Sequence, residues 1–466
     1  MAGRFHPGAT RRAAGTQIAL LVILVVGSFA LACASPALTL RHRASEQSWR
    51  DSTLASTPVE GEAELFSHVP HLERKTLVTA VLRRNPSIAA ARWAWKAALA
   101  RYPQERSLDD PILGYGVTPT SFGSSSVRDA HKVDLSQHVP FPGKLALRGE
   151  IALAEAEAAE HDLGAVRLRL ATVASLLFDD LWFLDRALAL NAEHTELLDE
   201  FLRIATARYE VGEASQQDPL QAEVEQAHLL HRDVVLTTAR RVAREQLNVL
   251  LHRRPDRPLP PPPDRLDPDP TEELDRSALV TEALQARPEL RAAQARVAAR
   301  ESAVALERRE FFPDFTLIGS YNRLWQAKDL QPFVGVRLNV PLRVARRRAA
   351  LDEARARYAH ATSEREDLED QVRFGVESGV DRLEEARHVL RLFESRILPA
   401  SRDQVAAARA GFETGRNSFL ALIEAERNLR TSRLGYDEAL ATVSRRRAEL
   451  ERAVGRIPGL YEVRSP

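Results

Sequence analysis

Histidine pairs at helical spacing are the residues of this sequence that most invite a search for metal chemistry. His68 and His71, and likewise His228 and His231, are spaced i, i+3, which could place each pair on one face of a helix. Neither pair has a third ligand nearby, so exposed polar surface is the simpler interpretation. A phosphate-binding glycine loop, a Ser-His-Asp arrangement and an H-E-x-x-H motif are absent from the sequence. We therefore predict no enzyme, no cofactor and no metal site.

An acidic cluster offers a second kind of candidate site. Asp381, Glu384 and Glu385 have the spacing i, i+3, i+4, which places them on one helix face. In an assembly of several copies they would form an acidic ring that attracts cations and repels anions. Glu and Arg decorate every exposed helix face of this chain, so a solvated surface is the alternative interpretation.

Composition restricts the class of protein. The 466 residues contain 65 Lys and Arg and 65 Asp and Glu, so no basic excess points to nucleic acid as a partner. The sequence is rich in Ala, Leu, Arg and Glu and has only 6% aromatic residues, which favours long helices or coiled coils. Cys33 is the only cysteine, so no disulfide framework exists.

The first 32 residues have the features of an export signal. Three arginines precede the apolar run from Ile18 to Ala32, and small residues end that run. The run is shorter than the ~20 residues that span a bilayer comfortably, which disfavours a permanent anchor helix. Cys33 follows at once, where a bacterial lipoprotein would be cleaved and acylated; ordinary cleavage beside a bystander cysteine is the alternative. With either outcome the mature protein leaves the cytoplasm, and we predict that it begins with an N-terminal extension over residues 33–75.

The remainder of the chain is an internal duplication. The segment from Leu77 to Ala94 aligns with the segment from Leu279 to Arg296, and three further motifs recur in the same order at nearly the same offset. We predict a first repeat over residues 76–253, a proline-rich linker over 254–273, a second repeat over 274–455 and a tail over 456–466. In each repeat a long proline-free stretch carries one apolar stripe at steps of three and four. Each stretch predicts a helix of about 45–55 residues, or roughly 70–80 Å.

Two pairs of short segments break the helical period with a period-two alternation typical of β-strands. They begin at Ile112 and Val133 in the first repeat and at Phe315 and Phe333 in the second. A pair of small soluble hairpins is one interpretation. Export, duplication and strands with one apolar face favour a membrane barrel instead. The polar positions predicted to face the barrel lumen are Asp134, Ser136, His138, Arg337 and Asn339.

Four strands cannot close a barrel, because an open edge in lipid leaves backbone groups without hydrogen bonds. The chain must therefore oligomerise so that several copies share one barrel. In "PFPGK", Pro140 and Pro142 end the strand, and Gly143 permits a sharp turn into the next helix.

From about Leu72 to Gly455 the sequence resembles the TolC-like outer membrane efflux proteins, or outer membrane factors. The motifs that carry this resemblance are the Asn85-Pro86 and Arg287-Pro288 helix starts, "LSQHVPFPGK", the turns "RYEVGEAS" and "GFETGRNS" with the "QAEVE" and "EAER" that follow them, and the twofold repeat. Within the family, Q-x-x-P-F-P-G-K looks most like the heavy-metal efflux channels of the CzcC and CusC type.

The resemblance implies a mostly α-helical fold with a small β part: a long helical barrel in the periplasm and a β-barrel shared by three protomers, with four strands from each. It places Gly212 and Gly415 at equatorial turns. It places the closed periplasmic tip at helical turns around Ala189–Glu193 and Arg391–Pro399, with the acidic cluster nearby.

The same resemblance implies partners and a function. The expected partners are outer membrane lipid, a periplasmic adaptor (membrane fusion protein) and an inner membrane pump of the resistance-nodulation-division (RND) class. The protein would be a passive export duct for heavy-metal cations. An organic-drug or type I protein-secretion duct is the nearest alternative, and a periplasmic coiled-coil adaptor or scaffold that never spans a membrane is the alternative of another class.

Overall fold

The computed structural model describes residues 36–54, 66, 69–123, 130–266, 274–323 and 327–460, so Cys33 and the predicted signal lie outside the described residues. The chain divides into two compact units. The first holds residues 1–53, 93–160 and 292–366, and the second holds residues 54–92, 161–291 and 367–466. A search of the described helices finds none with the length and apolar character needed to cross a bilayer.

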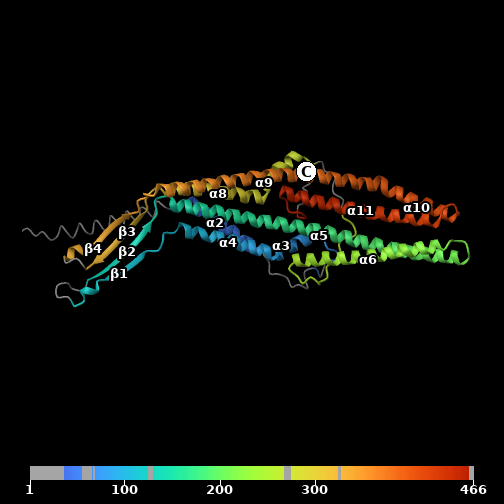
Figure 1. The fold of residues 1–466 in the computed structure, drawn as a ribbon, viewed down its shortest axis with the longest axis horizontal. Helices are drawn as coiled ribbons and strands as arrows, with labels where there is room; N and C mark the ends of the chain where they lie inside the picture. Colours follow the sequence, from blue (N-terminus) through green and yellow to red (C-terminus); the bar gives the residue numbers. More distant parts are fainter. Residues whose placement is uncertain are drawn as a thin grey trace, which may run out of the picture. The chain divides into compact units, whose positions relative to one another are not determined.

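The two halves of the chain have the same order of elements (Figure 1), as the twofold repeat predicts. The first half contains α3 (Arg74–Arg84), α4 (Pro86–Arg106), β1 (Ile112–Val117), β2 (His131–Val139), α5 (Lys144–Glu210) and α6 (Gln217–Leu250). The second half contains α7 (Arg276–Ala286), α8 (Pro288–Arg309), β3 (Phe315–Asn322), β4 (Pro332–Leu338), α9 (Val344–Leu392), α10 (Leu398–Glu413) and α11 (Phe419–Val454). One further helix, α2 (Pro36–Leu54), precedes the repeats.

Proline sets the same boundary in both repeats. Asn85 separates α3 from α4 and Arg287 separates α7 from α8, and each has an extended backbone with ψ near 120°. A residue before proline is driven out of the helical region by the proline ring, while proline itself is well suited to the first helical turn. The predicted helix starts at Pro86 and Pro288 are confirmed.

The long helix of the first repeat exceeds its predicted length, whereas α9 has 49 residues, within the predicted range. The α5 helix has 67 residues, which corresponds to about 100 Å at 1.5 Å per residue. In the second repeat, α9 continues through a π-helical segment, Phe393–Ile397, directly into α10. Pro399 lies at the start of α10 and has no N–H to donate, so a wider turn just before it lets the helix continue where a helix end is otherwise expected.

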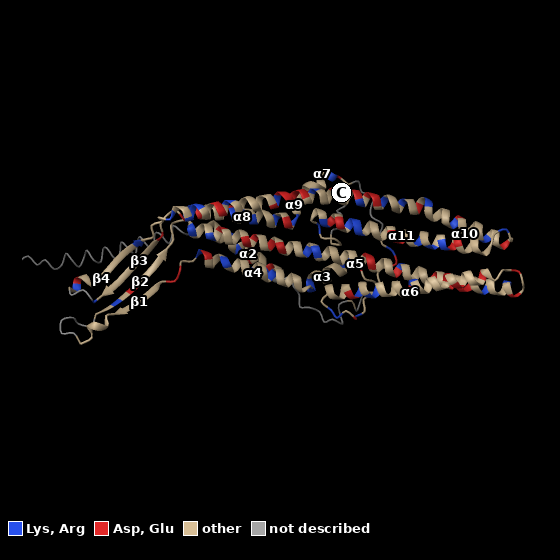
Figure 2. Cartoon of the chain, viewed as in Figure 1, with Lys and Arg blue, Asp and Glu red and all other residues tan. Residues whose placement is uncertain are grey.

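One apolar core joins four helices of the second unit. It contains Leu198, Phe201 and Ala205 from α5, together with residues of α6, α10 and α11 such as Leu229 and Phe419. The ring of Phe201 meets that of Phe419 edge to face, with their centroids 6.2 Å apart. In the first unit a smaller cluster packs Leu38 of α2 against α4 and α5. The charged residues are interspersed along the helices, whereas the strands carry few (Figure 2).

Candidate functional site

The four strands form one antiparallel sheet in the order β1-β2-β3-β4, and its register aligns their apolar residues. Val133 of β2 lies opposite Tyr115 of β1 and Tyr321 of β3. Leu317 of β3 lies opposite Val336 of β4. Because directly opposite residues share a face, one face of the sheet is mostly apolar across all four strands, with Gln137 opposite Leu317 as a polar exception. This face is open in the single chain: the exposed fractions of Tyr115 and Val336 are 71% and 62%.

The polar residues predicted from the alternation share the other face. His138 lies opposite Thr316, which in turn lies opposite Arg337, so these three side chains form one row across β2, β3 and β4. Asp134 and Ser136 lie on the same face of β2, four and two positions before His138. That this face lines a lumen stays a prediction.

The prediction for Asn339 needs a correction, because β4 ends at Leu338. Asn339 lies just beyond the strand, where its backbone N–H donates to the carbonyl of Asp314 over 3.1 Å.

The corner after β2 has the predicted turn. Pro140 and Pro142 follow the last strand residue, and Gly143 has a φ of +90°, a left-handed conformation that favours glycine. Nη1 of Arg309 at the end of α8 donates to the carbonyl of Pro142 over 2.6 Å. The ring of Phe141 stacks on that of Phe312 with their centroids 4.7 Å apart. The corner therefore packs directly on the segment that leads into β3.

Lys144 is the centre of this corner, and the sequence patterns did not reveal its role. Its side chain is only 1% exposed, and its Nζ forms ion pairs with Asp314 at 2.8 Å and Glu310 at 3.0 Å. Burial raises the pKa of Asp314, but hydrogen bonds from Lys144 and from the backbone N–H of Phe141 outweigh it, so the net pKa lies below its usual value. The only local signal is that Lys144 ends the "PFPGK" motif; its partners come from the other repeat.

Gly212 and Gly415 occupy the same kind of turn, but not an equatorial one. Gly212 has a φ of +79° and follows α5, and Gly415 has a φ of +70° and follows α10. The N–H of Gly212 donates to the carbonyl of Tyr209, and the N–H of Gly415 donates to that of Phe412. In each turn the N–H of the next residue donates to the carbonyl one residue earlier in the helix. This is the glycine cap that ends a helix. The chain then folds back, since α5 and α6, and α10 and α11, share one core.

The segments predicted to form the tip are continuous helix instead. Ala189–Glu193 lies within α5, and Arg391–Pro399 contains the π-helical segment between α9 and α10. The predicted placement is therefore wrong for both segments. The apolar stripes of α5 and α10 continue past these points to the core beside the two glycine turns, and this burial keeps the helices unbroken.

The predicted acidic cluster lies elsewhere as well. Asp381 and Glu384 form ion pairs with Arg276 of α7, at 2.6 and 2.8 Å. Asp381 comes about 50 Å along the helix before the turn at Gly415, so the placement near the tip is wrong. Glu385 is exposed. Arg276 offsets part of the negative charge that a ring would need.

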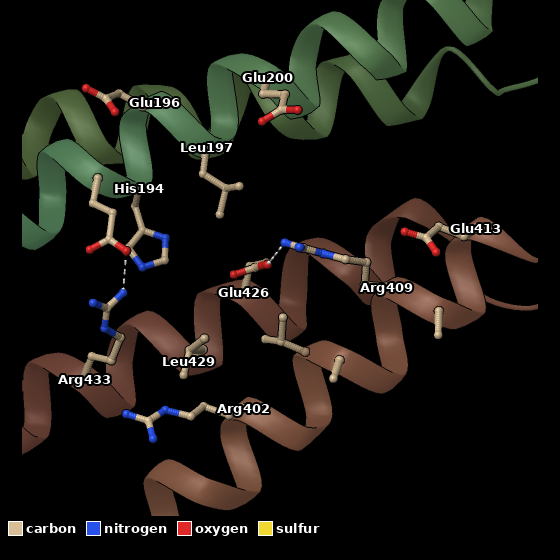
Figure 3. A pocket seen from close by; sticks show the side chains of 14 residues that line it. His194, Glu196, Leu197, Glu200, Arg402, Arg409, Glu413, Glu426, Leu429 and Arg433 are labelled. Atoms are coloured by element: carbon tan, nitrogen blue, oxygen red, sulfur yellow. Dashed lines mark hydrogen bonds and ion pairs between the residues drawn. The ribbon is translucent and has the colours of Figure 1, made fainter.

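A charged groove of about 770 Å³ lies between α5 and the α10–α11 hairpin (Figure 3). Glu193 of α5 pairs with Arg433 of α11 at 2.6 Å, and Glu426 pairs with Arg409 at 3.3 Å. His194 points into this groove and is 5% exposed. Burial, and then the neighbouring Arg430 and Arg433, lower the pKa of His194 to about 4. The two ion pairs fasten α5 to α11 and α10 to α11 around a neutral histidine.

The histidine pairs show no metal geometry. His228 and His231 are exposed on α6, and His68 lies outside the described residues. Among the described residues, no three His, Cys, Asp or Glu side chains converge as metal ligands. The absence of a metal site in the whole protein stays a prediction.

A comparison with protein-family models identifies the fold. The model "Outer membrane efflux protein" matches residues 77–252 and 279–456, which is more than half of the chain. The chain belongs to the outer membrane efflux protein family. The predicted family and fold class are thereby confirmed, and the match covers both halves of the duplication.

Solved structures of outer membrane channels share this fold. The chain is 20% identical to the outer-membrane channel OprN, covering 84% of this chain and 95% of OprN with a TM-score of 0.70. It is 18% identical to VceC from Vibrio cholerae, covering 82% and 96% with a TM-score of 0.70. It is 16% identical to CusC, covering 84% and 96%, also with a TM-score of 0.70. No curated protein matches the sequence.

Proposed function

We propose that this protein is the outer membrane channel of a tripartite efflux system, a passive duct formed by three copies of the chain. The observation that carries the proposal is the exposed apolar face of the sheet, which joins four strands whose outer edges, β1 and β4, have no strand partner within the described chain. In lipid each unpaired backbone group costs several kcal/mol. Pairing β4 of one copy with β1 of the next satisfies both edges, and three copies give a barrel of twelve strands.

Arginine substitutions on the two faces test the membrane location. Val336→Arg places a charge on the apolar face, where an arginine near the bilayer midplane costs about 2–4 kcal/mol. Ser320→Arg on the opposite face of β3 is the matched control and should insert normally. The measurement is the yield of folded trimer extracted from outer membranes with detergent. Equal yields from both variants would contradict a lipid-facing apolar surface.

Extraction separates the channel from a tethered scaffold. A Cys33→Ala channel should still need detergent and still form trimers, because the barrel holds it in the membrane. A soluble, monomeric Cys33→Ala protein would instead support the periplasmic scaffold.

The cargo we propose is a heavy-metal cation, exported with an RND pump and a periplasmic adaptor that docks at the hairpin turns of Gly212 and Gly415. The support is the "PFPGK" corner, which resembles channels of the CzcC and CusC type. A deletion strain challenged with zinc, cobalt, cadmium, copper and silver salts should be sensitised. Sensitivity to organic antibiotics alone would refute the metal assignment and leave the duct in place.

We also propose that Cys33 is acylated, which agrees with the position of the following helix α2 close to the strands. Nη1 of Arg106, at the end of α4 and a few residues before β1, donates to the hydroxyl of Thr39 near the start of α2, over 2.6 Å. The first turns of α2 are thus held close to the strands that we place in the membrane. Labelling with a radioactive fatty acid should mark the wild-type protein and not Cys33→Ala.

A further inference from the structure

The internal repeat makes the two strand-to-helix corners equivalent, yet they are built differently. The corner after β2 is closed by Lys144, which holds Glu310 and Asp314 of the segment before β3. This contact follows from the sheet order, because the end of β2 pairs with the start of β3: Val139 lies opposite Phe315. The closed corner therefore joins the end of one strand to the entry of its neighbour.

The corner after β4 is open. Leu342 aligns with Phe141 in the repeat, and its exposed fraction is 82%. Arg343 lies directly before α9 and Arg346 lies on its first turn, and both are exposed. Neither guanidinium forms an ion pair with another described residue, whereas the neighbouring Arg347 turns back to Glu310 of the same chain at 3.5 Å.

The segment before β1 is open in the same way. Asp109 and Asp110 align with the two residues before Pro313, and both are exposed with no ion pair to a described residue. Leu108 and Ile112 on either side are also exposed. One open site of the chain thus offers two cations beside an apolar side chain, and the other offers two carboxylates beside apolar side chains.

We propose that a second copy of this chain joins these sites: Arg343 and Arg346 of one copy bind Asp109 and Asp110 of the next, with Leu342 against Leu108. The inference rests on the proposed function, because it requires β4 of one copy to pair with β1 of the next. That pairing brings the corner after β4 to the entry of β1, as β2 meets β3 within the chain. Each copy then uses both sites, and the contacts close into a ring.

Cysteine cross-linking tests the contact directly. The chain has a single cysteine, so Arg343→Cys and Asp110→Cys can be combined in a Cys33→Ala background. Oxidation of the assembled protein should give covalent dimers and trimers on a non-reducing gel, since a disulfide needs the two Cα atoms within about 7 Å. Each single variant, and the pair Arg382→Cys with Asp110→Cys, should stay monomeric on the gel. Arg382 is exposed on α9 but far from the corner.

Charge reversal gives an independent measurement. Asp109→Arg/Asp110→Arg and Arg343→Asp/Arg346→Asp should each lower the trimer fraction several-fold, and combining all four changes should restore most of it. If Arg343→Asp/Arg346→Asp lowers the trimer fraction and adding Asp109→Arg/Asp110→Arg does not restore it, the pairing is overturned. The two arginines would then be assigned to lipid phosphates. An intact wild-type trimer with no cross-link also overturns the contact but keeps the proposed function, whereas the absence of any trimer would defeat the proposed function itself.

Discussion

Replacing Lys144 with methionine tests most directly how much its ion pairs stabilise the corner between β2 and α5. Methionine keeps the apolar stem and most of the volume, and it removes the ammonium that binds Glu310 and Asp314. The two carboxylates then lose a shared cation inside the corner. Asp314 keeps the backbone N–H of Phe141 as a donor at 2.8 Å, and Glu310 keeps Arg347 at 3.5 Å.

The expected cost follows from the burial of each partner. Removing one member of a fully buried ion pair destabilises a protein by about 3–5 kcal/mol. The Lys144 side chain is 1% exposed, but those of Glu310 and Asp314 are 27% and 15% exposed, so solvent screens part of the loss. Because each carboxylate also keeps a second donor, we expect the free energy of unfolding to fall by about 2–3 kcal/mol.

Urea-induced unfolding in detergent, at one protein concentration, measures this change. Lys132→Met is the matched control, because the paired side chains of Lys132 and Asp134 are 43% and 31% exposed. The loss of this pair should lower the free energy of unfolding by less than about 1 kcal/mol. Adding Glu310→Gln and Asp314→Asn to Lys144→Met should recover part of the loss by removing the uncompensated charges. If Lys144→Met costs no more than Lys132→Met, the reasoning about the buried ammonium is refuted.

Three further predictions concern the second unit and use the same unfolding assay. Gly415→Ala should lower the free energy of unfolding by about 1 kcal/mol, because the φ of Gly415 is +70°. Gly375→Ala, in the middle of α9 with open space around it, should raise that free energy by about 0.5–1 kcal/mol. Equal effects of the two substitutions would contradict the glycine cap. The pKa of His194 is lowered to about 4, so the unfolded chain binds more protons below pH 6.5 and stability falls as pH falls from 6.5 to 4; His194→Gln should flatten that slope. Burial raises the pKa of Asp179 to about 7 although Arg74 opposes it, so stability should fall as pH rises from 3.8 to 7; an unchanged slope in Asp179→Asn would argue against that shift.

The strands and the repeat could be predicted from the sequence because both leave local patterns. Alternation alone placed β1 and β3 at Ile112 and Phe315, and the register then aligned the apolar residues across the sheet. The contacts of Lys144 could not be predicted in this way. A buried lysine is defined by its partners, and Glu310 lies 166 residues away in the sequence. The short motif that contains Lys144 shows a turn but does not show which carboxylates that turn faces.

The glycine turns show why a correct local signal was assigned to the wrong place. A glycine with positive φ ends a helix by the same hydrogen bonds whether the next helix continues along the axis or folds back beside it. Burial decides between the two. Around Gly212 and Gly415, Phe201 of α5 and Val405 of α10 join one core with Leu229 of α6 and Phe419 of α11, which can form only if each chain segment reverses. The stripes of α5 and α10 continue to that core, so a helix break midway along either one would expose apolar surface with nothing to offset its cost.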